Sequence, residues 1–264
     1  MTATDTVFAG SIPARYDRYL GPLLFEPYAE IVAQRALSLR PRRVLEVAAG
    51  TGIVTSALHR ALPEAEIVAT DLNPTMLDIA AAKFPDGGVS FRPADALDLP
   101  FGDGEFDLVV CQFGVMFYPD KVRGNAEARR VLRDGGTYLA IIWDRLDRNP
   151  VSQALGQAVA EEFPDDPPTF IERMPFSYAD PALIERDLRD AGFADVRVEA
   201  VDARSRVDAH AAAYGMCVGS PMTAEIEERG PGAVERAAQA AERKLARFDG
   251  QEAPMSALFA TATK

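Results

Sequence analysis

Apolar positions between residues 42 and 143 alternate between two rhythms. Five short apolar or β-branched runs have the length of strands: 42–47, 66–71, 89–95, 106–112 and 137–143. Three segments between them have helical spacing: 53–62, 75–84 and 121–132. Strands that alternate with helices favour a parallel sheet covered on both faces. We therefore predict a doubly wound α/β fold with a ligand crevice at the carboxyl ends of its strands.

The flanks of this region follow other patterns. Residues before 40 have helical periodicity, which Pro22 and Pro27 are expected to interrupt. The stretch 148–174 is polar and rich in proline. The later expected elements are a helix over 181–191, a strand over 196–201, helices within 208–249 broken at 220–221 and 230–232, and a strand over 255–263. The two late strands are expected to pair antiparallel at the sheet edge, which gives a mostly parallel sheet of seven strands.

This pattern predicts a single domain over 1–264 that consists of a core and a helical lid. The core is expected at 37–147, 175–207 and 251–264. The lid or substrate cover is expected at 1–36, 148–174 and 208–250.

Composition excludes several classes of function. The chain has 28 Lys+Arg against 40 Asp+Glu, a formal net charge of −12, and nucleic-acid binding depends mostly on Lys and Arg. Two cysteines are too few for a disulfide framework or a four-cysteine zinc site, and no metal is expected. The chain shows no signal-peptide pattern over 1–17 and no apolar run of the roughly 18 residues that span a membrane. We expect a cytoplasmic protein with a small-molecule substrate.

Residues 46–52 carry the clearest chemical pattern. Glycines at 50 and 52, between a strand and a helix, let a ligand approach the backbone closely. Asp71 ends the next strand, where one carboxylate can accept from both hydroxyls of a ribose. A nicotinamide fingerprint would have a third glycine at 55, where this chain has Thr55. Glu46, under the turn, would repel a pyrophosphate and suits a ligand with a positive end.

The run VLEVAAGTG, residues 44–52, resembles the first motif of class I S-adenosylmethionine-dependent methyltransferases. Leu99-Pro100-Phe101 with FDLV at 106–109, and RVLRDGG at 130–136, resemble the subgroup of ubiquinone and menaquinone biosynthesis methyltransferases, methyltransferase type 11. The likeness covers residues 40–145 and, more loosely, 176–198. It implies the Rossmann-like methyltransferase fold. The family usually has glycine where Ala48 stands, and a methyl group there is tolerable if φ is negative.

The resemblance implies a site for S-adenosylmethionine. It assigns to the cofactor Tyr16, Glu46, Ala48, Gly50, Gly52, Asp71, Leu72, Met76, Asp95, Ala96 and Gln112. Glu46, the 48–52 backbone, the Gln112 carbonyl and Tyr16 would hold the amino-acid end. Asp71 would take the ribose. Leu72 and Met76 would pack on the adenine. Asp95 would accept a hydrogen bond from the adenine amino group, and the Ala96 N–H would face the ring. The alternative for Asp71 and Asp95 is that they only cap helices. The alternative for Leu72 and Met76 is that they only pack in the core.

Methyl transfer by in-line displacement needs alignment rather than a dedicated motif. No catalytic motif is found, and the candidate bases are His210, Tyr19 and Tyr214, with an ordinary surface position as the alternative for His210. The expected acceptor pocket comprises Phe25, Phe113, Phe117, Tyr214 and Met216. Such an apolar pocket suits a small hydrophobic or aromatic acceptor.

We therefore predict a small-molecule methyltransferase. An enzyme of the same fold that binds S-adenosylmethionine but performs non-methylating chemistry is an open alternative, and a non-catalytic cofactor-binding protein is another. A homodimer is one oligomeric state that the sequence leaves open.

Overall fold

The computed structural model describes residues 12–264. The part of the predicted cover at 1–11, and most of the segment considered for a signal peptide, lie outside the described residues. In the described part, no helix has the length and apolar character needed to cross a membrane.

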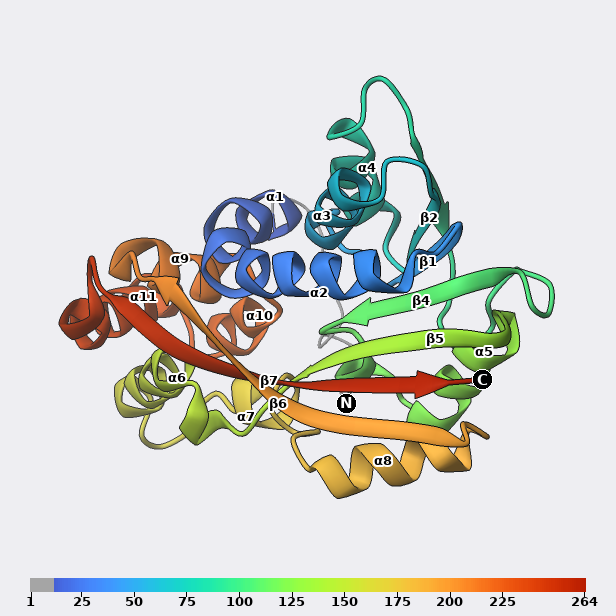
Figure 1. Ribbon diagram of the computed structural model, residues 1–264. Coiled ribbons are helices and arrows are strands. Elements are labelled where there is room, and N and C mark those ends of the chain that lie inside the picture. The colour runs from blue at the N-terminus through green and yellow to red at the C-terminus, as the bar shows by residue number, and fades with distance from the viewer. Residues whose placement is uncertain (1–11) are drawn as a thin grey trace. The chain divides into compact units, whose positions relative to one another are not determined.

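A seven-stranded sheet organises the fold, in the order β3-β2-β1-β4-β5-β7-β6 (Figure 1). Its strands are β1 (Arg43–Val47), β2 (Glu66–Asp71), β3 (Val89–Pro93), β4 (Phe106–Gln112), β5 (Leu132–Trp143), β6 (Asp195–Arg206) and β7 (Glu252–Thr263). β1 to β5 pair in parallel, and β7 pairs antiparallel with β5. The predicted α/β class and the antiparallel last strand are confirmed. Chain order reverses between β1 and β4, which is where such sheets bind ligands.

The chain divides into two compact units, which we name by their content. The sheet unit comprises Tyr28–Trp143, Tyr178–Val201 and Ala257–Lys264. The helical unit comprises the described residues up to Pro27, Asp144–Ser177 and Asp202–Ser256. The organisation as a single domain stays a prediction.

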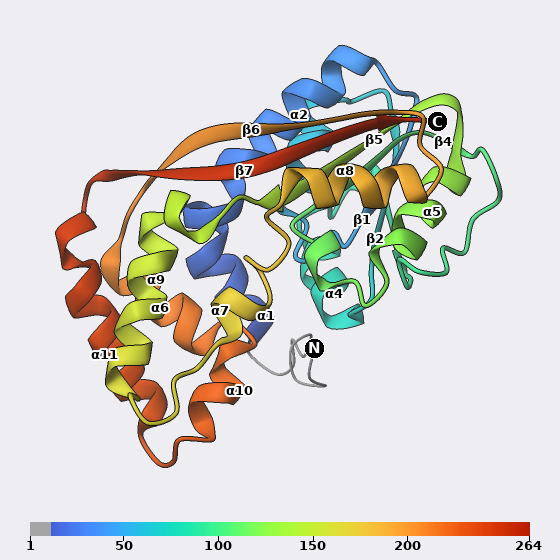
Figure 2. The same cartoon turned by 90° about the horizontal axis from the view of Figure 1, so that it is seen from below.

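The sheet unit buries the sheet between helices. Figure 2 shows α2 (Glu26–Leu39) on one face and α5 (Lys121–Val131) beside α8 (Pro181–Asp190) on the other. Strand β4 lies in the middle, and its Val109 and Val110 are fully buried. Two further helices, α3 (Ile53–Ala61) and α4 (Pro74–Ala82), follow β1 and β2. Asn73 caps α4 by accepting from the Thr75 N–H, and Pro74 opens the helix, as the sequence indicates.

The helical unit contains most of the elements that the sequence did not predict. Pro22 and Pro27 do not interrupt the first helical region: α1 (Ile12–Arg15) continues through a π-helical segment (Tyr16–Phe25) into α2. Pro27 follows this junction directly, and because it has no N–H the continuous helix lacks one backbone hydrogen bond there. The Pro-rich stretch also contains α6 (Pro150–Glu162) and α7 (Phe170–Arg173), since Pro150 occupies the first turn of α6.

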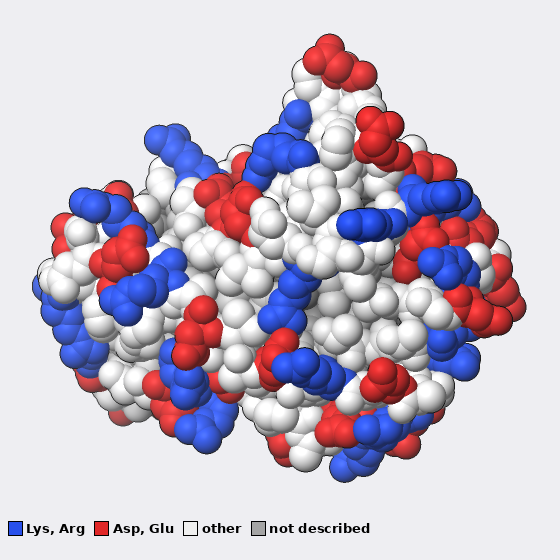
Figure 3. Space-filling model, in the orientation of Figure 1, with Lys and Arg blue, Asp and Glu red and all other residues white. Residues whose placement is uncertain are grey.

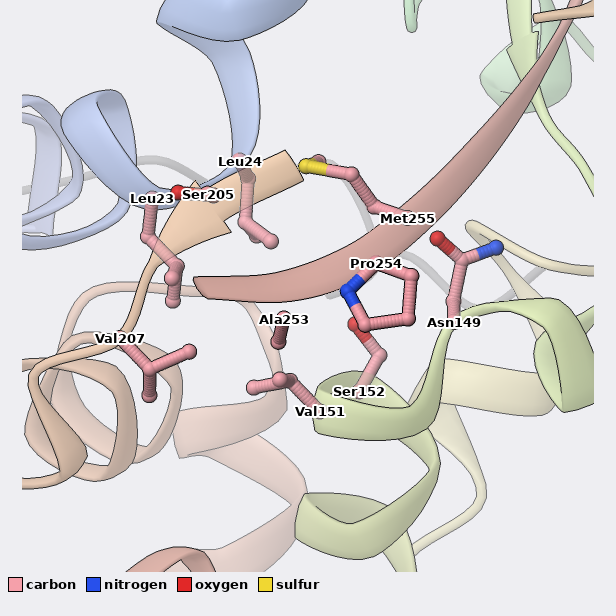
Figure 4. Close-up of a pocket in the computed structure, with 10 residues that line it drawn as sticks. All are labelled: Leu23, Leu24, Asn149, Val151, Ser152, Ser205, Val207, Ala253, Pro254 and Met255. Atoms are coloured by element: carbon pink, nitrogen blue, oxygen red, sulfur yellow. The ribbon is translucent and has the colours of Figure 1, made fainter. Parts of the chain in front are cut away.

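Three more helices complete this unit: α9 (Ala209–Val218), α10 (Met222–Glu227) and α11 (Ala233–Leu245). Small residues four positions apart, Ala233, Ala237 and Ala241, form the buried side of α11, which packs on α6 and α9. Figure 4 shows a small cavity in this unit between Leu23, Val151, Ser152 and Met255. Its volume is about 20 Å³, which has room for about one water and none for an acceptor.

Charged side chains of both signs are mixed over the molecular face in Figure 3. Several are paired: Arg43 with Glu105 at 3.0 Å, and Arg35 with Glu199 at 2.7 Å. The net charge of −12 is therefore not gathered into one acidic field on this face.

Candidate functional site

Glu46 is a buried carboxyl group in β1, the strand that pairs with the central strand β4. It is 2% exposed and accepts a hydrogen bond from Thr55 Oγ1 at 2.6 Å. Burial raises the pKa of Glu46 to about 8, the Thr55 hydrogen bond opposes that rise, and the charge of Asp71 adds to it. At neutral pH the group is therefore largely protonated. A cation placed beside it would favour the carboxylate, so the position suits an ammonium group.

The loop after β1 is held in a left-handed conformation by backbone hydrogen bonds. φ is +56° at Gly50 and +81° at Gly52. The Gly50 N–H donates to Asp71 Oδ2 at 2.8 Å, and the Ala49 N–H donates to the Thr70 carbonyl at 2.8 Å. A Cβ on Gly52 would lie 2.8 Å from Ala80 Cβ, whereas a Cβ on Gly50 would meet nothing within 4 Å. The loop thus packs against α4 at Gly52 and has open space at Gly50.

Ala48 has a φ of +56°, so the condition of a negative φ is not met. A side chain in this region crowds the following carbonyl at a cost of about 1–2 kcal/mol. The structure accommodates the methyl group at Gly114, where a Cβ would lie 2.6 Å from Ala48 Cβ. Ala48 and Gly114 therefore act as a matched pair.

Asp71, at the end of β2, is anchored on both carboxylate oxygens. Oδ2 accepts from the Gly50 N–H, and Oδ1 accepts from the Asn73 N–H at 2.8 Å. Burial raises its pKa, and these backbone hydrogen bonds oppose the rise. A carboxylate has about four acceptor positions, so the backbone hydrogen bonds leave acceptor capacity for ribose hydroxyls. Leu72 beside it is 66% exposed, whereas Met76 is 3% exposed. Of the two residues predicted to pack on adenine, only Leu72 presents an exposed apolar side chain.

The turn after β3 carries Asp95 and Ala96. Asp95 is exposed, and its Oδ1 accepts from the Leu97 N–H at 2.9 Å. The turn is tied to the β2 end, because the Ala94 N–H donates to the Asp71 carbonyl at 3.0 Å. Gln112 ends β4, which pairs with β1. The strand ends that carry Glu46, Asp71, Asp95 and Gln112 therefore meet at one edge of the sheet.

Phe113 and Phe117, two predicted pocket residues, lie in the sheet unit just after β4. Phe113 is 7% exposed and stacks on Trp143, with ring centroids 3.9 Å apart. Tyr28 meets Phe113 edge to face at 5.6 Å. Phe117 is half-buried. Phe113 thus packs in an aromatic cluster, and its contact with an acceptor stays a prediction.

The other predicted residues lie in the helical unit. Tyr16 stacks on Phe25 with ring centroids 4.9 Å apart, and Met216 is 9% exposed. The three candidate bases form one row: Tyr19 meets Tyr214 at 5.3 Å, and Tyr214 stacks on His210 at 5.9 Å. His210 is 66% exposed, and its Nδ1 lies 3.1 Å from Glu242 Oε2. Tyr214 also lines an open depression of about 660 Å³.

Thr55 is a site residue that the sequence reasoning missed. Position 55 drew attention only because a nicotinamide fingerprint needs glycine there. One turn into α3, Thr55 instead donates to Glu46. A hydroxyl residue nine positions after a buried strand acid is the signal that identifies it. Across residues 12–264, no group of three or more His, Cys, Asp or Glu is arranged to hold a metal ion.

Residues 45–140 match the family model described as a methyltransferase domain. The chain is 42% identical over 139 residues to a demethylmenaquinone methyltransferase of Deinococcus radiodurans, and this match covers 51% of this chain and 57% of that protein. The match spans about half the length of the curated relatives.

Two solved structures share the fold of this chain. The YcgJ protein of Bacillus subtilis matches with a TM-score of 0.59 and 16% identity, over 90% of this chain and 98% of that one. Phosphoethanolamine N-methyltransferase 2 of Haemonchus contortus, solved with S-adenosylhomocysteine, matches with a TM-score of 0.63 and 16% identity, over 100% of this chain and 61% of that one. At such identities the likeness concerns the fold alone.

Proposed function

We propose that this protein transfers a methyl group from S-adenosylmethionine to a small hydrophobic or aromatic acceptor. The observation that carries the proposal is the edge where Glu46 and Asp71 meet, inside the segment that matches the methyltransferase domain. The coarser statement, an S-adenosylmethionine-dependent methyltransferase, has the support of that match. The class of acceptor is the finer part of the proposal.

The residues at this edge fit the proposed cofactor in three respects. Buried Glu46 suits its ammonium group. Asp71 retains acceptor positions for the ribose hydroxyls. Gly50 faces open space, and Leu72 offers an exposed apolar side chain to the adenine. Asp95, Ala96, Gln112 and Tyr16 remain proposed contacts.

S-adenosylmethionine supplies an electrophilic methyl group on a sulfonium. The chain's own part is to hold the donor in one orientation, since proximity and alignment alone can supply about 7–11 kcal/mol of a barrier. The tied loop at Gly50 and the anchored Asp71 provide that orientation before any ligand arrives. We assign no general base: His210 is 66% exposed and its hydrogen bond is to Glu242.

A reduced naphthoquinone is the acceptor to test first. Relatives named demethylmenaquinone methyltransferase share 42% identity with this chain over 139 and 108 residues, which favours an aromatic ring as the acceptor. The proposal extends to small aromatic acceptors as a class, with ring carbon or hydroxyl oxygen as the methylated atom.

The test is calorimetric binding of S-adenosylhomocysteine, followed by transfer of a labelled methyl group to reduced demethylmenaquinone and other small phenols. We expect binding and label in the organic extract, and both should be strongly reduced in Asp71→Ala. Asp78→Ala, an exposed acid on α4, is the matched control and should retain both. Absence of binding would contradict the cofactor assignment. Binding without transfer to any phenol or quinol would favour non-methylating chemistry instead.

A further inference from the structure

The segment between β3 and β4 is held by arginine side chains on its backbone carbonyls. Arg123 Nε donates to the Leu97 carbonyl at 3.0 Å. Arg130 donates to the Leu99 carbonyl at 2.9 Å and to the Phe101 carbonyl at 2.7 Å. These hydrogen bonds span five residues, 97–101, that have no regular secondary structure of their own. We call this arrangement the arginine clamp; it comprises Arg123, Arg130 and residues 97–101.

Glu127 orients the clamp. Arg130 makes a bidentate contact with the Glu127 carboxylate, through Nε at 2.7 Å and Nη2 at 2.8 Å. The same carboxylate accepts from the Leu99 N–H at 2.8 Å. Arg123, Glu127 and Arg130 stand at helical spacing on one side of α5. The hydrogen bond from Arg130 lowers the pKa of Glu127, so the pair stays charged across the neutral range.

The clamp joins two runs that the sequence singled out separately. Leu99-Pro100-Phe101 supplies the carbonyls, and the run that begins at Arg130 supplies the guanidinium. A third arginine, Arg92 on β3, donates to the Pro100 carbonyl at 3.0 Å. Hydrogen bonds therefore join the two runs in the folded chain, although about 30 residues separate them in the sequence.

The clamp begins where the turn of Asp95 ends. The Asp95 carboxylate bonds within its own turn, to the Leu97 N–H, and the Asp98 N–H donates to the Asp95 carbonyl at 3.0 Å. The turn is tied at its start through Ala94 to the Asp71 carbonyl and at its end through Leu97 to Arg123. The end tie depends on the orientation of α5 side chains.

We propose that Arg123, Arg130 and Glu127 are positioning residues that fix the Asp95–Ala96 turn, Arg123 at its end and Arg130 with Glu127 through the segment that follows it, and so set the selectivity of the cofactor site for an adenine base. The inference rests on the proposed function, in which this turn contacts the adenine amino group. A clamped turn presents the Asp95 carboxylate at one place. A released turn adapts to other base edges.

The test compares two ligands by calorimetry: S-adenosylhomocysteine and S-inosylhomocysteine, in which a carbonyl oxygen replaces the adenine amino group. The variants are Arg130→Met and the milder Arg123→Met, whose side chain is exposed and makes one bond to the clamp. Arg133→Met is the matched control, since Arg133 pairs with Asp107 outside the clamp. Denaturant unfolding of each variant identifies those that fold.

The wild type should prefer the adenine ligand by at least about tenfold, the equivalent of one hydrogen bond. Arg130→Met, or Arg123→Met if the former does not fold, should reduce that preference at least about threefold, and Arg133→Met should leave it unchanged. An unchanged ratio in the folded clamp variants would overturn the inference, because a merely structural role lowers stability without moving the ratio. Failure of the wild type to bind either ligand would instead contradict the proposed function.

Discussion

The candidate residues of the sheet unit and of the helical unit are fixed by different means. Glu46 and Asp71 stand at the ends of buried parallel strands and are held by short hydrogen bonds to Thr55, Gly50 and Asn73. His210 and Tyr214 stand on a helix, half-buried or exposed, and are held by ring contacts and one hydrogen bond to Glu242. The first group is therefore held in place by several hydrogen bonds, whereas the second lies on the surface of a helix. We expect substitutions in the two groups to differ accordingly.

The largest effect is expected from Asp71→Ala. It removes the acceptor proposed for two ribose hydroxyls and releases the Gly50 N–H. Charge-assisted hydrogen bonds contribute about 1.5–3 kcal/mol each, so affinity for S-adenosylhomocysteine should fall at least about tenfold. Calorimetry checks this against Asp78→Ala. Equal affinities in the two variants would remove the ribose assignment.

Glu46 predicts a pH dependence of cofactor binding. Its pKa is about 8 in the folded protein, so below pH 8 a ligand ammonium must displace a proton. Affinity should rise by up to about tenfold per pH unit between pH 6 and 8 and then level off. Titrations in buffers with different ionisation enthalpies should show proton release at pH 7. Glu46→Gln should flatten the profile, and a flat wild-type profile would contradict the role.

The same pKa has a consequence for stability without ligand. The folded value exceeds the ordinary value of 4.5, so the folded state binds more protons than the unfolded state between these two pH values. The contribution of Glu46 to stability is therefore fully present below about pH 4.5 and lost as pH rises through 8. Urea unfolding of wild type and Glu46→Gln should diverge over this window, with the wild type losing more.

Gly114→Ala tests the matched pair in the loop. Its Cβ would lie 2.6 Å from Ala48 Cβ and 2.7 Å from Cys111 Sγ, so unfolding should be easier by about 1–3 kcal/mol. Ala48→Gly alone should stabilise by about 0.5–1 kcal/mol, because glycine tolerates the φ of +56°. In the double variant Ala48→Gly should recover part of the loss. Purely additive effects in a urea unfolding series would show that the two positions are not coupled.

The smallest effect is expected from His210→Gln in the helical unit. The side chain is 66% exposed, so stability should change by less than about 0.5 kcal/mol. Cofactor affinity should stay at the wild-type value. If methyl transfer fell more than about tenfold at unchanged cofactor affinity, His210 would act as a general base. The helical unit would then contribute a catalytic residue, as the sheet unit contributes the cofactor contacts.

The sequence predicted the sheet unit well, because this unit contains short apolar strands and clear helix-capping signals. The strands at 66–71 and 106–112 have the predicted bounds, and the Asn73 and Pro74 signals mark the start of α4 correctly. Asp71 followed from its position at a strand end. The helix α6 was missed since composition outweighed periodicity in a stretch rich in proline.

Other features are invisible to local patterns. The space for the methyl group of Ala48, whose φ is positive, depends on the absence of a side chain at Gly114, which is 66 residues away along the chain. The clamp of Arg130 on Leu99 joins a side chain to a distant backbone carbonyl, which has no periodic signature. The burial of Phe113 against Trp143 and of Met76 in the core likewise depends on packing.

The most direct measurement is a crystal structure of the protein with S-adenosylhomocysteine. The proposed cofactor site predicts that the ribose hydroxyls bind the Asp71 carboxylate, that the ammonium group lies beside Glu46, and that the adenine amino group faces Asp95. A ligand bound away from the β1 and β2 ends, or ribose hydroxyls that make no contact with Asp71, would contradict it.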